Sequence, residues 1–239
     1  MKNNSLSKIN FTYHVFSPKA WREKSQTAEM QQAFQTWLKV WTDTYKGRDF
    51  EVKAEEFIRH DLICAVMADG EAAAVHCYSF FDLESKPDVS TKYFQFFSPT
   101  FIEKMKEKDI HTVMSMEYLT VNEKYRSSQI GFSLGRALIQ LGVRLFEDSP
   151  GHAIVAPARK DVKVHEMAYD CGFTCIEGDV IQRGFACDMI AYFKGDHKNV
   201  SDPFLSRICD RLWDQRVISD SIREHVSAPA IVIPIRRAV

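Results

Sequence analysis

The chain has 239 residues, of which 45% are hydrophobic and 26% are charged, and its formal net charge at pH 7 is −1. This near-neutral balance, without a basic cluster, argues against nucleic acid as the main partner. Residues 1–13 lack the apolar core of a signal peptide, and no run approaches the ~18 apolar residues of a membrane span, so we expect a cytoplasmic protein.

The six cysteines show no C-x-x-C pair and no histidine-rich partner segment. Neither a zinc site nor a disulfide framework is therefore indicated, and we expect buried free thiols. The length suits one large domain or one domain with an extension.

The N-terminal part predicts a strand followed by an aromatic helix. Residues 9–16 alternate as a strand does, and Ser17-Pro18 then offers an N-cap with proline at the first helical position. We expect the helix to end at Gly47. It would carry an aromatic stripe at helical spacing that is typical of core: Met30, Phe34, Trp37, Leu38, Trp41 and Tyr45.

A hairpin and an aromatic insertion come next. Asp69-Gly70 stands between the apolar runs 62–68 and 72–81, which predicts two strands joined by a tight turn. Residues 82–89 are polar and contain proline, so we expect a loop. An aromatic cluster then leads into a short helix that we expect to end near Asp109, and it suits either local core or a pocket for a bulky apolar group: Phe94, Phe96, Phe97 and Phe101.

The stretch from Met114 to Glu147 organises the rest of the chain. Alternation over residues 113–121 predicts a strand that is buried on both faces. Apolar residues then recur at helical spacing, so we expect a helix that begins close to Ile130, with one apolar face: Ile130, Leu134, Ala137, Leu138, Leu141 and Leu145.

The short loop of residues 125–131 joins that strand to that helix. Small residues that open into a helix leave backbone N–H groups unpaired at the positive end of the helix dipole, which favours a phosphate. Arg126 and Lys124 add positive charge, and Gly131 permits a close approach of the backbone. An ordinary strand-to-helix turn with an exposed arginine is the alternative.

The C-terminal part predicts a closing hairpin and an extension. Two β-rich stretches in residues 174–193 flank a turn at 182–185. Ser201-Asp202-Pro203 then caps a helix, and 230–235 is a short apolar run. We expect the extension, residues 197–239, to pack on the domain or on a second copy, because its apolar helix residues would be a liability alone: Leu205, Ile208, Leu212 and Trp213.

The run Leu119-x-Val121-x-x-x-Tyr125-Arg126-x-x-x-x-Gly131 resembles the acyl-CoA-binding motif of the GNAT superfamily of N-acyltransferases, whose common form is R/Q-x-x-G-x-G/A after a strand. Residues 153–156, residues 160–171 and the pair Gly172-Phe173 resemble the strand, the helix and the Gly-Phe pair that follow there. The sequence departs from the motif at Gln129, which stands where the first glycine is expected and whose side chain would crowd a pyrophosphate.

The resemblance implies an α/β fold in residues 1–196, with a mixed, twisted central sheet and helices on both faces, and the chain departs from the family in the C-terminal helical extension that follows. It implies acetyl-CoA or another acyl-CoA as co-substrate, with the strand of residues 113–121 splayed from its neighbour to receive the pantetheine arm. The first helices of that family border the acceptor site, so the aromatic stripe is also a candidate wall. The cofactor-binding residues that it implies are Leu119, Thr120, Val121, Arg126, Ser127, Ser128, Gln129, Ile130 and Gly131.

Two residues are candidates for the chemistry. An amine must lose a proton to attack a thioester, and Glu117, inside the strand, is placed to accept that proton. Burial in the strand would raise the pKa of the Glu117 carboxylate. Pairing of Glu117 with a buried arginine or with backbone amides is the alternative. The resemblance also implies a tyrosine that protonates the leaving thiolate. Tyr169 is the candidate, although the tyrosine of the family lies one residue earlier, where this chain has Ala168.

The leading function is therefore transfer of an acyl group from a CoA thioester to an amine by direct attack, and acetyl is the first candidate for that group. The acceptor is a small molecule or a protein. A long-chain N-acyltransferase that uses an acyl-carrier protein, resembling acyl-homoserine-lactone or N-acyl amino acid synthases, is an alternative that Gln129 and the aromatic insertion suit. A non-catalytic binding module with the same fold and an α/β domain with a chance motif are further alternatives, and a homodimer is a candidate assembly.

Overall fold

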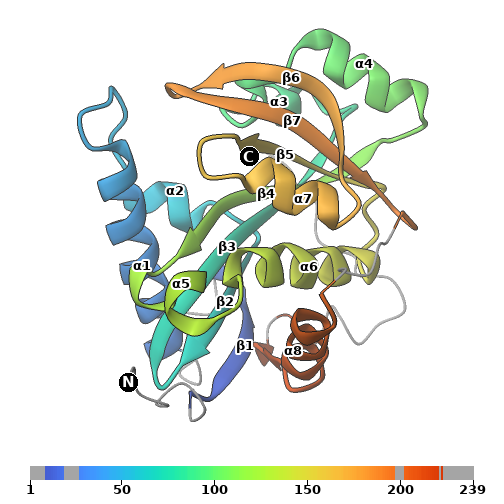
Figure 1. Cartoon of the computed structure of the whole chain (residues 1–239). Helices are drawn as coiled ribbons and strands as arrows, with labels where there is room; N and C mark the ends of the chain where they lie inside the picture. The colour runs from blue at the N-terminus through green and yellow to red at the C-terminus, as the bar shows by residue number, and fades with distance from the viewer. Residues whose placement is uncertain (1–8, 19–26, 197–201, 221, 223–239) are drawn as a thin grey trace.

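One eight-stranded sheet forms the centre of the molecule, with its strands in the order β6-β7-β5-β4-β3-β2-β1-β8 (Figure 1). The computed structural model describes residues 9–18, 27–196, 202–220 and 222. Neighbouring strands run antiparallel, except that β4 is parallel to β5 and β1 is parallel to β8. The predicted mixed, twisted sheet is confirmed. Its strands are β1 (Phe11–Phe16), β2 (Leu62–Ala68), β3 (Glu71–Asp82), β4 (Thr112–Val121), β5 (Ala153–Arg159), β6 (Thr174–Gln182), β7 (Phe185–Phe193) and β8 (Val217–Ile218).

Helices cover both faces of this sheet, as predicted. One face packs against α6, α7 and α8 (Figure 1). The other face packs against α1 and α2 beside β1 to β4, and against η3 and α4 beside β5 and β7. The helical elements are α1 (Thr27–Tyr45), α2 (Ala54–Ile58), α3 (Lys86–Val89), α4 (Pro99–Glu107), α5 (Ser127–Ile130), α6 (Leu134–Glu147), α7 (Val164–Asp170) and α8 (Pro203–Asp214), with 3₁₀ turns η3 (Phe94–Phe96) and η4 (Glu123–Tyr125).

The N-terminal predictions hold where the structure describes the chain. The start expected at Ser17-Pro18 borders residues 19–26, which lie outside the described residues, and α1 is described from Thr27. Its aromatic stripe is core, because Trp37, Trp41 and Tyr45 are buried against the sheet. The hairpin of β2 and β3 turns at Asp69-Gly70, both in the left-handed conformation that such tight turns use.

The aromatic insertion is core as well. Its phenylalanines pack with Leu83 and Met105 over β5 and β7, and Phe101 is 1% exposed. The polar segment before it, predicted as a loop, contains the short helix α3, because the Ser85 side chain accepts a hydrogen bond from the Asp88 backbone N–H and proline follows in the first turn.

The expected helix start close to Ile130 is wrong, because the helix is divided into two. The short α5 ends at Gly131, whose φ of 82° is a left-handed conformation that terminates a helix. The long α6 begins afresh at Leu134, where Ser133 accepts a hydrogen bond from the Arg136 backbone N–H as N-cap. From there α6 is buried against the sheet, as its apolar periodicity predicted.

The C-terminal elements differ from prediction mainly in their bounds. The helix expected at 160–171 is the shorter α7, preceded by a turn, and β5 extends to Arg159. Asp202 is the N-cap of α8, which packs on α6 of the same chain through Leu205 and Cys209. The strand β8 then pairs with β1, which no sequence pattern indicated. The run 230–235 lies outside the described residues, and the domain division at residue 196 stays a prediction.

The cysteines bear out the expectation of free thiols, with one difference. Five are buried, whereas Cys175 is exposed at the surface strand β6. In the part of the chain that the structure describes, no helix is both long and apolar enough to cross a membrane.

Candidate active site

The sheet opens between the neighbouring strands β4 and β5. The parallel strands β4 and β5 pair only over Val113–Ser115 and Ala153–Val155, although β4 continues to Val121 on β3 and β5 continues to Arg159 on β7. Pro157 is compatible with this opening, because proline has no N–H for a strand ladder and is confined to strand edges. A central strand of the sheet therefore becomes an edge in its second half.

An apolar cleft lies on the α6 and α7 side of the opening. The empty volume in and around it is about 560 Å³, part of which is open solvent. His76 also lines it, and burial lowers the pKa of that ring to about 3, so the histidine is neutral at pH 7. The aliphatic and aromatic side chains that line the apolar cleft include Leu119, Ile139, Ala156, Val164, Phe173 and Ile190.

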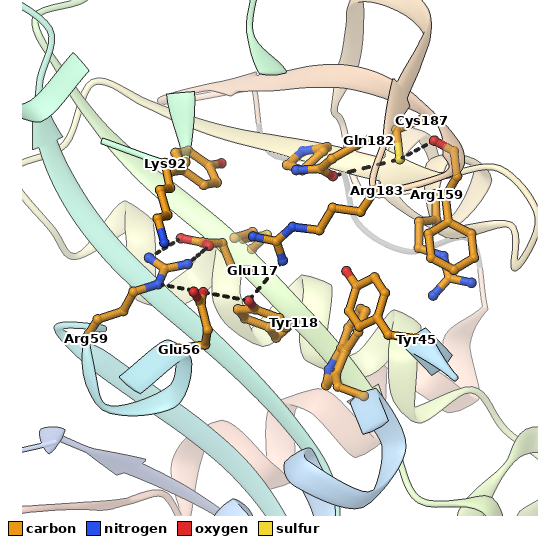
Figure 2. A pocket seen from close by; sticks show the side chains of 15 residues that line it. Tyr45, Glu56, Arg59, Lys92, Glu117, Tyr118, Arg159, Gln182, Arg183 and Cys187 are labelled. Atoms are coloured by element: carbon orange, nitrogen blue, oxygen red, sulfur yellow. Dashed lines mark hydrogen bonds and ion pairs between the residues drawn. The ribbon is translucent and has the colours of Figure 1, made fainter. Parts of the chain in front are cut away.

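A charged pocket lies on the opposite side of the opening, beneath α1, α2 and the β6–β7 turn. Its empty volume is about 620 Å³, again with open solvent included. Its acidic and basic side chains are Glu56, Arg59, Lys92, Glu117, Arg159 and Arg183, which Figure 2 shows around one space. The charged pocket and the apolar cleft share the lining residues Trp41, Met116, Tyr118, Pro157 and Arg159, so the two meet between β4 and β5.

A bulge in β4 determines which side chains face the charged pocket. The strand alternation predicted over residues 113–121 breaks at Tyr118, whose φ is 58°, and the pairing with β3 shifts register there. As a result, Glu117 and Tyr118 both face the α1 and α2 side. Trp41 stabilises the bulge, because its Nε1 donates to Thr120 Oγ1 at 2.8 Å and that hydroxyl donates to the Tyr118 carbonyl at 2.6 Å.

Glu117 lines the charged pocket and is 9% exposed, and its sequence neighbours Met116 and Tyr118 line both spaces. Ser115 Oγ donates to its Oε1 at 2.9 Å, and the Arg59 guanidinium donates to both carboxylate oxygens. His60 Nδ1 lies 3.7 Å from Oε1. Burial raises the pKa of Glu117, and the charge and hydrogen bonds of Arg59, with the hydrogen bond of Ser115, offset only part of that effect.

A second chain of contacts runs from Arg59 to Arg183. Arg59 Nε lies 3.3 Å from Glu56 Oε2, which also accepts a hydrogen bond from the Tyr118 hydroxyl at 2.9 Å. Arg183 in turn donates to that hydroxyl oxygen at 3.2 Å. Burial alone would raise the pKa of Glu56, but the Tyr118 hydrogen bond and the charges of Arg59 and Arg183 lower it overall. The two carboxylates of the charged pocket thus have pKa shifts of opposite sign.

Comparison with known proteins finds matches among solved structures only, since no protein-family model and no curated protein sequence matches. The arylalkylamine N-acetyltransferase 2 of Aedes aegypti matches with a TM-score of 0.53 and 11% identity, over 77% of this chain and 99% of that one. An N-acyl amino acid synthase from uncultured soil microbes matches with a TM-score of 0.51 and 9% identity, over 77% of this chain and 89% of that one. The chain has the GNAT fold.

A CoA-dependent acyl-homoserine lactone synthase, solved with SAM and isopentyl-CoA, has the same fold. It matches with a TM-score of 0.51 and 9% identity, over 93% of this chain and 92% of that one. At these identities the likeness concerns the fold alone. The roles of the site residues therefore depend on the geometry of this chain.

The predicted cofactor residues of this GNAT fold fall into two groups. Leu119 lines the apolar cleft and Val121 packs beside it, whereas Thr120 points to the other face and holds Trp41. Arg126 and its neighbours Ser127, Ser128 and Gln129 are exposed, and Ile130 packs against the core. Their site role stays a prediction.

The unpaired amides expected in this loop are only partly present. The N–H groups of Gln129 and Ile130 donate to the Arg126 carbonyl, and that of Gly131 donates to the Ser127 carbonyl. The short helix α5 therefore uses three of the donors that were expected to bind a phosphate. Arg126 itself borders a groove beside α1 that also contains Lys39 and Glu123, an ion pair at 2.7 Å.

Tyr169 lies apart from both spaces. It lines neither the apolar cleft nor the charged pocket, and its hydroxyl donates to Asp188 at 2.6 Å. Burial, followed by that hydrogen bond, raises the pKa of the Tyr169 phenol well above its usual value. We therefore assign the hydroxyl to this structural bond. Ala168, at the position where the family has its tyrosine, does line the apolar cleft.

Sequence reasoning missed Glu56, Arg59 and Arg183. Glu56 and Arg59 stand three apart around a five-residue helix, which is too short to show a periodic signal. Arg183 had a weak signal: it occupies the hairpin-turn position before Gly184 where asparagine or aspartate is usual, and its φ is 48°. A bulky residue in the left-handed conformation at a turn suggests that its side chain is needed.

Proposed function

We propose that the protein transfers an acyl group from a CoA thioester to a primary amine by direct attack. One observation carries this proposal: the opening between β4 and β5 joins an apolar cleft to a charged pocket, and the charged pocket holds a buried carboxylate, Glu117, between two residues of β4 that line both spaces. A donor arm and an acceptor amine that enter from opposite sides would meet beside that carboxylate.

The apolar cleft fits the donor arm. After Ser115 and Val155 the facing edges of β4 and β5 have no strand partner, so their backbone N–H and C=O groups are available to an extended chain with amides, such as pantetheine. When bound, the thioester supplies the acyl group and the leaving thiolate. Leu119 and the two strand edges would hold the arm, and Arg126 with the backbone N–H groups of Ser127 and Ser128 would meet the phosphates.

Glu117 would act as the base. It accepts the proton that the amine loses as the C–N bond forms and the C–S bond breaks. Arg59 and Ser115 hold the carboxylate in one orientation, and the raised pKa of Glu117 improves its match to a neutral-pH proton transfer. The same pair with Arg59 would also hold a purely structural carboxylate, so the test of Glu117 needs two readouts.

A long-chain acyltransferase that takes its donor from an acyl-carrier protein is the second candidate. The backbone N–H groups of residues 129–131 already donate hydrogen bonds within α5, so they are not free to bind the phosphates of a nucleotide. This favours the carrier-protein candidate, because a carrier protein presents phosphopantetheine without that nucleotide. The aromatic insertion no longer favours it, because those rings are packed core. A panel of acetyl-CoA, longer acyl-CoA and acyl-carrier protein, assayed for thiol release with primary amines, separates the two.

The Glu117→Gln variant tests the mechanism. If the carboxylate is the base, the variant keeps donor affinity and fold, but kcat/KM falls by about 10²–10⁴-fold. Wild-type kcat/KM should fall as the pH drops through the raised pKa of Glu117, because protonation removes the base. The variant should lose that limb. A variant with wild-type activity per folded molecule and a lower melting temperature would make Glu117 structural. A wild type inactive with all donors would favour a binding module.

A further inference from the structure

The charged pocket holds more cations than carboxylates. Four basic side chains line it, against the carboxylates of Glu56 and Glu117. Arg59 contacts both carboxylates, and Arg159 pairs with Asp161 at 2.6 Å while it stacks on the Phe185 ring. Once these pairs are made, Arg183 and Lys92 form no direct ion pair with a carboxylate among the described residues, although the charge of Arg183 does lower the pKa of Glu56.

Arg183 is held in place by groups that do not neutralise it. Its guanidinium lies 3.8 Å from the centre of the Phe50 ring and 6.0 Å from that of Tyr45. Its hydrogen bonds go to neutral phenols, at 3.2 Å for the Tyr118 hydroxyl. Figure 2 shows the side chain extended from the β6–β7 turn into the middle of the pocket, with Glu117 and Tyr118 ahead of it. A half-buried guanidinium positioned in this way, on a turn residue with positive φ, is suited to bind an anion in a fork of two hydrogen bonds.

The rest of the pocket adds a second requirement. A ligand with several positive charges would meet Arg183, Arg59 and Lys92 and would be repelled. Aromatic rings of Trp41, Tyr45, Tyr93 and Phe185 line the same space and would pack against an apolar side chain. The ligand that matches these features has an amine, an anionic group and an apolar body.

We propose that the acceptor is a primary amine that carries a carboxylate in the same molecule, as an apolar amino acid does, and that Arg183 binds this carboxylate. Lys92 supplies a second positive charge at the mouth of the pocket. With the carboxylate on Arg183, the amine faces Glu117, which accepts its proton. This inference rests on the proposed acyl transfer and names its acceptor class.

Paired acceptors test it directly. Phenylalanine, tyrosine and leucine are each compared with the amine that lacks only the carboxylate, namely phenylethylamine, tyramine and isoamylamine, with the best donor of the panel above. We expect kcat/KM to be about 10- to 100-fold higher for the amino acid in at least one pair, because one charge-assisted fork is gained. Equal or higher values for the simple amine in all pairs would overturn the inference and leave acyl transfer in place.

The Arg183→Gln variant assigns the contact. We expect the preference for the amino acid to collapse to within about threefold, because kcat/KM for the amino acid falls by more than kcat/KM for the simple amine. Arg183→Lys should restore part of the preference. A residue that only supports the fold would lower both rates together, and that outcome would overturn the role of Arg183. The matched control is Arg48→Gln, which removes an exposed guanidinium that contacts the same turn through the Gly184 carbonyl but does not line the charged pocket.

If no amine is acylated, the proposed function fails, and calorimetry decides the inference separately. Binding of phenylalanine but not phenylethylamine, lost in Arg183→Gln, would support a carboxylate site. Equal binding of the two ligands, or binding of neither, would overturn it.

Discussion

The two sides of the opening between β4 and β5 are built in different ways. The apolar cleft is formed mostly by β4, α6, β5 and α7, which follow one another along the chain, and nearly all of its lining is hydrophobic. The charged pocket draws Arg59 from the C-cap of α2, Lys92 from the insertion and Arg183 from the last hairpin, across more than half of the chain. One strand, β4, serves both sides, because the bulge at Tyr118 changes which residues face each.

This difference shows that the two sides are stabilised by different kinds of interaction. Burial of apolar surface holds the apolar cleft together, and it tolerates exchange of one hydrophobic residue for another. The charged pocket depends on hydrogen bonds and ion pairs with fixed directions, so single atoms matter there. Substitutions on the two sides should therefore affect different steps.

Among substitutions away from Glu117, the largest effect is expected for Ala156→Phe. Ala156 lines the apolar cleft just after the last residue of β5 that pairs with β4, and a phenyl ring there would fill the space proposed for the donor arm. Affinity for CoA, measured by calorimetry, should fall by at least about 100-fold, with a modest loss of stability from overpacking. Glu117→Gln and Arg183→Gln, on the other side, should bind CoA as wild type does. Equal loss in all three would show that the two sides are not separate.

A smaller effect is expected for Thr120→Val. The change leaves the buried Trp41 Nε1–H without its acceptor, which should cost about 1–3 kcal/mol of unfolding free energy in denaturant titrations. The bulge that positions Glu117 and Tyr118 would also loosen, so kcat/KM should fall about tenfold.

The matched control for this variant is Thr36→Val. That residue also makes a hydroxyl contact between α1 and the sheet, to the Ala72 carbonyl at 3.1 Å, but away from the bulge. It should lose stability and keep its activity. If both variants keep full activity per folded molecule, the bulge does not need this support.

The smallest effect is expected for Tyr169→Phe, because Tyr169 lines neither the apolar cleft nor the charged pocket. Loss of the hydrogen bond to Asp188 should cost about 1 kcal/mol of stability. Steady-state kcat/KM should stay within about twofold of wild type, because the hydroxyl faces neither space. A tenfold or greater drop, with the alkaline limb of the pH profile lost, would return Tyr169 to the mechanism as the acid.

Much of the fold was predictable because it follows from local patterns. The hairpin at Asp69-Gly70, the buried strand β4 and the apolar face of α6 each appear as a period or a turn signal within a short window. The division at Gly131 was missed, because residues 125–131 were predicted as a loop that opens into one helix near Ile130, whereas four of them form the separate helix α5. The strand β8 has only two residues, which is too short for any period to show.

The candidate site was predictable only in part. Glu117 was found because a carboxylate in an apolar strand is conspicuous, and Leu119 because it belongs to the resembled motif. Tyr169 was a candidate because the resemblance implies a tyrosine one residue earlier, and in the structure its hydroxyl donates to Asp188. Cys175, in an exposed strand, could not be told from the buried cysteines.

The sequence by itself determined the α/β class, the hairpin of β2 and β3, the buried strand β4 and the apolar face of α6, because these depend on periodicity and turn chemistry over neighbouring residues. Only the tertiary structure decided the charged side. The partners of Glu117 and the open position of Arg183 depend on segments far apart in the chain, and a single bulge at Tyr118 reverses which side chains of β4 face them. The sequence shows which side chains are charged, but only the fold determines which groups they contact.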